Sequence, residues 1–313
     1  MSRPGARFRM STQEGIVSTA TETTTCSARR LPPLSFSPAV LAGLLATSGP
    51  LSPVLAGPPS LAAVATWNAY TVATEKRIED ELARGTPFLV QDTFAPGKGT
   101  HTASGPPRPG IFVFAMPPAT SGGQPIKTGD ALIHHWLGSV FIPGATMADV
   151  LAFVRDYDNN GRYFDDVMAS RQLSNEGDVY RIFLKLKRTK SVVTVHYNTE
   201  HTVVYGAADA ERSSSRSVAT KIAELDEVGT ASEREKTPEE ERGFMWRLNS
   251  YWRFLAVPGG VIVECESTSM SRAIPTGLGW LIGHYVKSIP KESLERTLTG
   301  IKRGVLARAG MAQ

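Results

Sequence analysis

The C-terminal third of the chain holds two alternating segments joined by a tight turn, followed by one amphipathic segment. The alternating segments are Met245–Val257 and Val261–Arg272, and the turn is Pro258-Gly259-Gly260. Alternation of apolar and polar residues is the pattern of antiparallel strands with one buried face. A helix that follows such a hairpin can bury its apolar side only against the apolar face of the sheet. This order favours an α+β fold.

The two faces of this hairpin differ in chemistry. One face carries Trp246, Leu248, Trp252, Phe254, Val261, Val263 and Cys265. The other face carries Arg247, Asn249, Tyr251, Arg253, Glu264 and Glu266. Strand parity sets Arg253 opposite or diagonal to Glu264 or Glu266, and we expect a solvated ion pair worth at most about 1 kcal/mol. In the alternative interpretation, these charges line a cavity and act as acid and base.

The segments around this hairpin extend the same architecture. The final helix follows Pro290, and its apolar residues Leu294, Leu298, Ile301 and Val305 form one stripe. A short helix is predicted at Met147–Arg155, because Thr146 and Asp149 form a capping-box-like start. The remaining predicted strands are Ala131–Ile142, Phe164–Leu173, Val179–Arg188, Val192–Tyr205 and Ser213–Leu225.

This order of elements resembles the START-like, polyketide cyclase/dehydrase and lipid-transport superfamily. The resemblance covers roughly residues 127–308 and is clearest in RLNSYWRF, GGVIVECESTS and SIPKESLERTLTGIKRGV. It implies a helix-grip fold, in which a curved antiparallel β-sheet wraps around a long C-terminal α-helix, here with an N-terminal helical extension. It rests on a pattern of elements, and it includes no diagnostic catalytic motif.

Members of that superfamily enclose an apolar cavity between the sheet and the helix. The resemblance therefore implies that this protein binds a hydrophobic, lipid-like small molecule there, without chemistry. A filled core, a cyclase- or hydratase-like enzyme on the same fold, and a cell-envelope interaction protein stay open as alternatives, because the same alternation serves all of them. The residues predicted to line the cavity are Trp246, Leu248, Trp252, Phe254, Val263, Leu281, Tyr285 and Leu298.

Residues 1–56 have the features of a leader. Five arginines precede an apolar stretch at residues 38–46, which is too short and too close to prolines to span a bilayer. The ending Val54-Leu55-Ala56 fits a signal-peptide cleavage site. We therefore expect export to the periplasm or the outside, with no transmembrane segment in the mature chain. The alternative is a disordered leader on a cytoplasmic protein.

Residues 57–126 form a separate N-terminal extension in this scheme, ahead of a helix-grip domain at 127–313. The segment Leu61–Arg84 lacks Pro and Gly and ends at Gly85, which predicts a helix with its C-cap. Its apolar stripe is Val64, Trp67, Thr71, Ile78 and Leu82. Residues 95–130 are rich in Gly and Pro, and we expect loops there with one short strand at Ile111–Phe114.

Charge and cysteine content exclude several classes of function. The formal net charge is +4, of which residues 1–56 supply +3 through five arginines against two glutamates. The rest of the chain is nearly neutral, so we expect no nucleic-acid partner. The chain has two cysteines, Cys26 and Cys265, which excludes a disulfide framework and a Cys-rich zinc site.

Three weaker motifs suggest no cofactor and no metal. Asp156 to Gly161 matches the first half of a calcium loop, but Val167 stands where a bidentate Glu is needed, so a polar turn is expected. His134, His135, His196 and His201 fall on strands without a third ligand in place, and we interpret them as ordinary strand histidines. Gly277 to Gly283 lacks the third glycine of a dinucleotide fingerprint. The oligomeric state stays open.

Overall fold

The computed structural model describes the backbone of residues 57–102, 105–118, 126, 129–190, 193–273 and 279–311, and their side chains except those of 190 and 279–287. These residues all belong to one compact unit, Pro53–Gln313. The leader at 1–56 lies outside the described residues, so its interpretation as a signal peptide stays a prediction. The side chains of Leu281 and Tyr285 also lie outside the described part.

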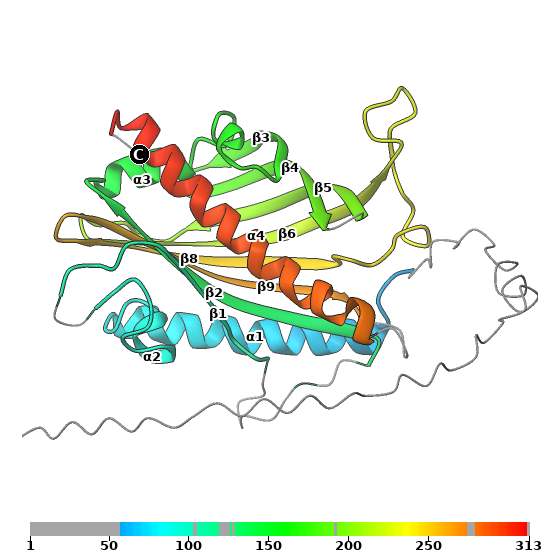
Figure 1. Cartoon of the computed structure of the whole chain (residues 1–313), viewed down its shortest axis with the longest axis horizontal. Helices are drawn as coiled ribbons and strands as arrows, with labels where there is room; N and C mark the ends of the chain where they lie inside the picture. The colour runs from blue at the N-terminus through cyan, green and yellow to red at the C-terminus, as the bar shows by residue number, and fades with distance from the viewer. Residues whose placement is uncertain are drawn as a thin grey trace, which may run out of the picture. The chain divides into compact units, whose positions relative to one another are not determined.

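An antiparallel sheet of nine strands is the main element of the described chain (Figure 1). Its strands follow the order β1-β2-β9-β8-β6-β5-β4-β3, and β7 pairs with β6. The strands are β1 (Ile111–Ala115), β2 (Ala131–Pro143), β3 (Val167–Glu176), β4 (Val179–Lys190), β5 (Val193–Tyr205), β6 (Arg212–Asp226), β7 (Arg234–Glu235), β8 (Arg247–Val257) and β9 (Gly260–Arg272).

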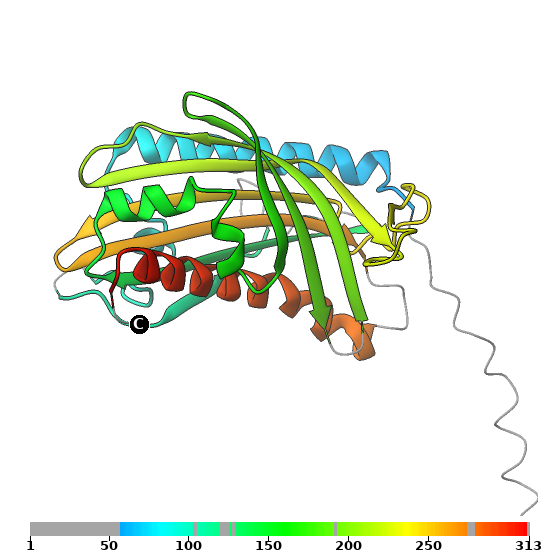
Figure 2. The same cartoon turned by 90° about the horizontal axis from the view of Figure 1, so that it is seen from above.

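Two long helices lie on opposite sides of this sheet (Figure 2). The C-terminal helix α4 (Gly279–Arg308) covers what we call the inner face, which carries Trp252 and Phe254. The N-terminal helix α1 (Leu61–Arg84) covers the outer face, which carries Arg253, Glu264 and Glu266. The short helices are α2 (Gln91–Phe94), α3 (Met147–Val154) and the 3-10 turn η1 (Asn160–Tyr163). The predicted α+β helix-grip fold is confirmed.

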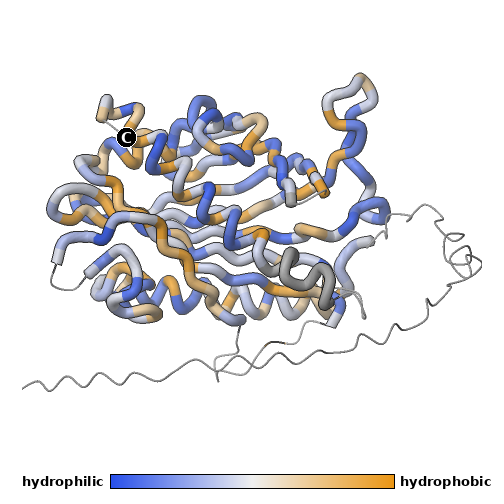
Figure 3. Tube along the Cα trace, in the orientation of Figure 1, coloured by the Kyte–Doolittle hydropathy of each residue, from blue (hydrophilic) through white to orange (hydrophobic). Residues whose placement is uncertain are grey.

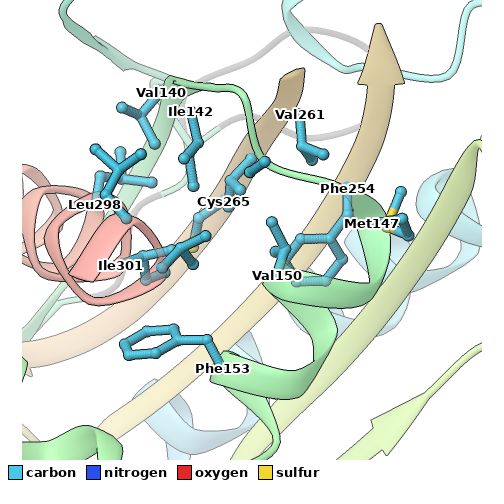
Figure 4. Close-up of a cluster of buried hydrophobic side chains, with 14 of the residues drawn as sticks. Val140, Ile142, Met147, Val150, Phe153, Phe254, Val261, Cys265, Leu298 and Ile301 are labelled. Carbon is cyan, nitrogen blue, oxygen red and sulfur yellow. The ribbon is translucent and has the colours of Figure 1, made fainter. Parts of the chain in front are cut away.

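The hydrophobic core fills the inner face where α3 and α4 meet β2, β8 and β9 (Figure 4). Phe153, Phe254 and Leu298 are all buried there. Close approach of α4 to β2 requires glycine at Gly138, because a Cβ at that position would lie 2.7 Å from Leu298. The alternation that drives this burial can be followed along the strands in Figure 3.

Local sequence signals account for the helix ends. The hydroxyl of Ser60 accepts a hydrogen bond from the Ala63 amide at the start of α1, and Gly85 ends that helix with φ of 73°. Thr146 and Asp149 form the reciprocal capping box of α3. The helices predicted at Leu61–Arg84 and Met147–Arg155 are thus confirmed as α1 and α3.

The start of the last helix and three short elements differ from the sequence predictions. Helix α4 begins at Gly279 and continues through Pro290, although we expected it to follow that proline. A helix can continue through proline at the cost of one backbone hydrogen bond, which packing against the sheet offsets here. The predictions also missed α2, η1 and β7, which are too short to show a periodic pattern.

The segment 57–126 packs onto the same unit as the strands that follow it. Its strand β1 pairs with β2 from Ile111↔Val140 to Ala115↔Trp136 and forms one edge of the sheet. Its helix α1 lies against β8 and β9. This segment therefore supplies both an edge strand and the cover of the outer face.

Candidate functional site

A cavity of about 200 Å³ lies between the inner face of the sheet, the segment around η1, and α4. Its walls come from β3, β4, β5, β6 and β8 on the sheet side and from Arg296, Thr297 and Ile301 on α4. Most of the wall is aliphatic or aromatic, as in pockets for hydrophobic ligands. Representative apolar side chains are Ile182, Leu184, Leu186, Val203, Trp252 and Phe254.

The rings of Trp252 and Phe254 form an aromatic part of this wall and lie with their planes nearly parallel. Their planes differ by 5° and their centroids lie 6.5 Å apart. The two residues lie two positions apart on β8, so their side chains leave the same face of the sheet.

A neutral histidine lies in the cavity wall. His201 comes from β5, and its Nε2 lies 3.0 Å from the hydroxyl of Thr199. That hydroxyl donates to the carbonyl of Leu184, so it accepts from Nε2–H, and Nδ1 is the unprotonated nitrogen. Nδ1 faces the hydroxyl of Ser217 at 3.5 Å. Burial lowers the pKa of His201 to about 4, which keeps the ring uncharged at neutral pH.

Two serine hydroxyl groups on neighbouring strands also line the cavity. Ser217 on β6 pairs in register with Ser250 on β8, and both line the cavity. Such groups can bind a hydroxyl or carbonyl of a ligand without any net charge.

Two tyrosines close the cavity near the C-terminal end of α3. The Tyr157 and Tyr205 hydroxyls lie 2.8 Å apart, and Tyr205 donates to the carbonyl of Val154. Burial raises the pKa of Tyr205 to about 12, so the phenol stays protonated. Arg155 stacks over the Tyr205 ring at 4.3 Å.

Charged residues lie at another part of the cavity wall. Arg188 on β4 and Arg296 on α4 both form ion pairs with Asp166, at 3.0 Å and 2.7 Å. All three side chains line the cavity.

The structure describes the side chains of six of the eight predicted cavity residues and places these six in three different environments. Leu248, Trp252 and Phe254 line the cavity. Val263 and Leu298 lie on the inner face but are fully buried in the filled core. Leu281 and Tyr285 have side chains outside the described part. Trp246 lies elsewhere.

Trp246 is a correction to the sequence analysis. It packs against Ala63, Trp67 and Met270, under α1, and does not line the cavity. The physical reason is that β8 begins at Arg247, so the side-chain alternation of the strand does not extend to Trp246. The large apolar side chain is instead buried by the N-terminal helix.

The cavity also extends further from the last hairpin than we expected. Its walls include inward-facing residues of β4, β5 and β6, among them Leu184, His201 and Ser217. Sequence analysis treated His201 as an ordinary strand histidine, and it did not assign Arg188, Arg296 or Asp166. Strand parity was the signal that could have found Leu184 and His201, because both share a face with buried neighbours.

The charges of the last hairpin lie on the outer face but are not solvated, which is a second correction. The register Arg253↔Glu264 confirms the predicted cross-strand position. However, Arg253, Glu264 and Glu266 are only 3%, 1% and 2% exposed. The reason is that α1 and the segment leading into α2 cover them, which the hairpin sequence alone does not reveal.

Ion pairs connect these buried charges to α1. The Arg253 guanidinium donates to Glu81 at 2.5 Å and to the carbonyl of Phe88 at 2.7 Å. Glu266 accepts hydrogen bonds from Arg77 and, at 2.7 Å, from the Nε2 of His135. These contacts attach α1 to the centre of the sheet.

The pKa values of Glu264 and Glu266 are shifted in opposite directions. Burial raises the pKa of Glu264 to about 7, although its carboxylate accepts amide hydrogen bonds from Val90 and Gln91 at 2.6 and 2.9 Å. Burial also acts on Glu266, but the hydrogen bond from His135 and the charges of His135, Arg77 and Arg253 outweigh it and lower the pKa of that carboxyl.

Helix α1 also contributes a tyrosine to this buried network. The hydroxyl of Tyr70 lies 2.5 Å from the Nδ1 of His135, on the side of the ring opposite Glu266. Tyr70, His135 and Glu266 thus form one hydrogen-bonded chain beneath the helix. It lies across the sheet from the cavity.

The calcium-like segment acts as a polar turn. Asp156 accepts from Asn159 at 2.8 Å and from Arg308 at 2.7 Å, and Asp158 accepts from the Gln172 amide at 2.8 Å. Among the described residues, no group of three or more His, Cys, Asp or Glu side chains is placed to hold a metal ion. Within the same residues, no helix has the length and apolar character needed to cross a bilayer.

Comparisons with known proteins identify solved structures of similar arrangement. No family model and no curated protein matches the chain. The STAR-related lipid transfer protein from Xanthomonas axonopodis is 19% identical with a TM-score of 0.41, covering 62% of this chain and 94% of that one. Human StAR-related lipid transfer protein 5 is 11% identical with a TM-score of 0.41, covering 79% and 99%. The Zhui aromatase/cyclase from Streptomyces sp. R1128 is 10% identical with a TM-score of 0.38, covering 58% and 100%.

Proposed function

We propose that this protein binds a small hydrophobic molecule in the cavity on the inner face of the sheet, without changing it chemically. The observation that carries this proposal is the cavity itself, about 200 Å³ of space beside Leu184, Trp252 and Ile301. The adjacent part of the inner face is filled by side chains such as Leu298 (Figure 4). Protein interiors rarely hold large voids, so unfilled space between apolar walls indicates a ligand.

The cavity volume limits the size of that molecule. Pockets for drug-sized ligands enclose about 300–1,000 Å³. At about 200 Å³, this cavity is smaller. It suits a single short chain or a compact ring system, and a lipid with two long chains would require the sheet and α4 to move apart.

Blocking the cavity tests the proposal. Ser217 lines the cavity on β6, and Thr220 is exposed on the same strand. We expect the uncharged fluorescent probe N-phenylnaphthylamine to bind the parent protein and Thr220→Phe, but not Ser217→Phe, because the new ring fills the cavity. Equal binding to all three proteins would show that the probe binds elsewhere and that the proposal is wrong.

Native mass spectrometry supplies an independent test. A ligand retained through gentle purification adds a discrete mass to the parent protein and to Thr220→Phe. The added mass should be absent from Ser217→Phe.

An enzyme on the same fold is the second candidate, and His201 is the observation that favours it. Its unprotonated Nδ1 faces the cavity hydroxyl of Ser217, as a general base would. General-base catalysis is most efficient when the pKa lies near the working pH, whereas burial holds that of His201 at about 4. Binding without chemistry is therefore the function that we favour.

Incubation of the protein with the ligand that it retains separates these two candidates. A binder returns the molecule with its mass unchanged. A cyclase- or hydratase-like enzyme returns it with the gain or loss of water, and His201→Gln abolishes that change.

Export is a further part of the proposal. The arginine-rich start and the Val54-Leu55-Ala56 ending of the leader support cleavage after Ala56 and a location outside the cytoplasm. N-terminal sequencing of protein from its native host tests this. Recovery of intact Met1 from the cytoplasm contradicts it.

A further inference from the structure

Two arginines in the cavity wall share a single carboxylate oxygen. Arg188 Nη1 lies 3.0 Å from Oδ2 of Asp166, and Arg296 Nε lies 2.7 Å from the same atom. The Arg188 and Arg296 side chains are 19% and 34% exposed, so water reaches both but does not surround them. All three residues line the cavity.

These arginines lie at one end of an otherwise apolar row. Ile182, Leu184, Leu186 and Arg188 leave the same face of β4 at every second position, and all four line the cavity. His201 pairs with Ile182, at the other end of that row. Ile182 and Arg188 lie six positions apart on the strand, which is about 20 Å between their Cα atoms. The cavity wall is therefore charged at one end, apolar in the middle and polar but uncharged at the other end.

Positive charge exceeds negative charge at the arginine end. One carboxylate, Asp166, faces two guanidiniums. Asp165 also lines the cavity, but it is 62% exposed and pairs with Arg303 at 2.8 Å. Among the described residues, the hydrogen bonds of Arg296 use only its Nε, so its two terminal nitrogens have N–H groups available.

The electrostatics of Arg188 agree with this excess. Burial lowers the pKa of its guanidinium, the charge of Asp166 counteracts that effect, and the charge of Arg296 lowers the pKa further. A second anion beside the two arginines would offset both burial and mutual repulsion. Guanidinium groups bind carboxylates and phosphates through paired hydrogen bonds.

We propose that the ligand is a single-chain amphiphile whose anionic group, a carboxylate or a phosphate, binds Arg188 and Arg296 while its apolar chain lies along Leu186 and Leu184 toward Trp252. This inference rests on the proposed function and adds the chemical class of the ligand. The volume of about 200 Å³ limits the chain to one of modest length.

Three compounds with the same ten-carbon chain test the inference: decanoate, decyl phosphate and decanol. Affinity is measured by isothermal titration calorimetry for the parent protein, Arg296→Gln and Lys291→Gln. Arg188 keeps Asp166 paired in Arg296→Gln, so we expect that variant to fold. Lys291 is a matched control because it also carries a positive charge on α4 but pairs with Glu295 outside the cavity lining.

We expect an anionic compound to bind the parent protein at least about tenfold more tightly than decanol, since hydrogen bonds between two charged groups are stronger than those between uncharged groups. Arg296→Gln should weaken that compound by about tenfold and leave decanol unchanged, whereas Lys291→Gln should change neither. Added salt should weaken the anion and not decanol. The tighter of decanoate and decyl phosphate identifies the source of the anionic group.

The failures of the two proposals are distinguishable. Suppose that decanol binds as tightly as both anions and that Arg296→Gln changes the affinities of all three compounds equally. The arginines then serve only to attach α4 to the sheet. In that case this inference is wrong, while the proposed function stands. If neither the three compounds nor N-phenylnaphthylamine binds, the proposed function is wrong, and this inference fails with it.

Discussion

The inner and outer faces of the sheet both bury polar groups, but they differ in what surrounds those groups. On the outer face, Arg253, Glu264 and Glu266 are nearly completely covered, and each has charged or backbone partners on α1 or in the segment that follows it. On the inner face, His201 bonds to Thr199 on its own strand and faces the hydroxyl of Ser217. Both His201 and Ser217 also adjoin unfilled space.

This difference separates a structural network from a candidate site. Buried charges that pair between a helix and a sheet hold these two elements together, and removal of one partner leaves the other charge less compensated. Polar groups beside a cavity keep the capacity to bind something else. By this criterion the outer network fixes α1 on the sheet, and the inner face carries the function.

The largest expected effect is on the outer face, where Glu266→Ala leaves the buried His135 without its carboxylate and removes one of the two carboxylates of Arg77, which keeps Glu81. We expect the free energy of unfolding to fall by about 3–5 kcal/mol, as for other broken buried ion pairs. Urea denaturation measures it. The control Asp80→Ala removes an exposed i,i+4 pair with Lys76 and should cost no more than about 0.5 kcal/mol. Equal costs would mean that the outer network does not hold α1.

The next prediction compares how one buried titratable group on each face changes the stability of the protein with pH. The pKa of His201 is lowered from 6.5 to about 4, so the unfolded state binds the proton first as the pH falls. The full contribution of uncharged His201 to the free energy of unfolding is present above about pH 6.5. About 3 kcal/mol of that free energy is lost as the pH falls to 4. The pKa of Glu264 is raised from 4.5 to about 7. Its contribution is complete below about pH 4.5 and is lost as the pH rises to 7.

Between about pH 4.5 and 6.5, the contributions of His201 and Glu264 to the free energy of unfolding change with pH in opposite directions. We expect His201→Gln to lose stability as the pH rises through this window, and Glu264→Gln to gain it, each by about 1.4 kcal/mol per pH unit relative to the parent protein. Urea denaturation at a series of pH values measures how the free energy of unfolding changes with pH. A difference in stability between variant and parent that is the same at every pH does not affect this measurement. Parallel curves for all three proteins would contradict both assignments.

A smaller effect concerns ligand affinity rather than stability. Trp252 lines the cavity, whereas its neighbour Tyr251 faces α1 and donates to Glu75. Trp252→Ala should weaken N-phenylnaphthylamine by about tenfold, since loss of apolar contact of this size corresponds to about 1–2 kcal/mol. Tyr251→Phe should leave the affinity unchanged. The reverse result would place the binding site on the outer face.

The smallest effect is expected at the rim of the outer network. Arg216 pairs with Glu75 at 2.7 Å, but its side chain is 45% exposed. We expect Arg216→Gln to lower the free energy of unfolding by less than about 1 kcal/mol, in contrast to Glu266→Ala. Thermal or urea denaturation detects the difference. A cost as large as that of Glu266→Ala would extend the structural network to the edge of α1.

Local patterns were sufficient to predict most elements of the fold. The predicted bounds of α1 match the structure, because Ser60 and Gly85 mark its ends through contacts within a few residues. The face of α1 was harder to predict. Its buried residues include Tyr70 and Thr74 rather than Thr71, because the surface on which it lies is itself polar.

The candidate site was only partly predictable for the same reason. Parity on β8 correctly placed Leu248, Trp252 and Phe254 at the cavity, but it could not distinguish them from Val263, which fills the core. A filled and an unfilled interior need the same alternation. Arg188 and Arg296 come together only through Asp166, which lies on neither of their elements.

The sequence by itself determined the order of the long strands and helices, the helix caps and the pairing of the last hairpin, because periodicity, turns and caps act over a few residues. The resemblance of that order to a known superfamily then implied the helix-grip fold. Only the tertiary structure decided which polar residues are buried and where space is left. Arg77 and Glu266, for instance, lie 189 positions apart along the chain. The environment of a strand face depends on the element that packs over it, and that element can come from anywhere in the chain.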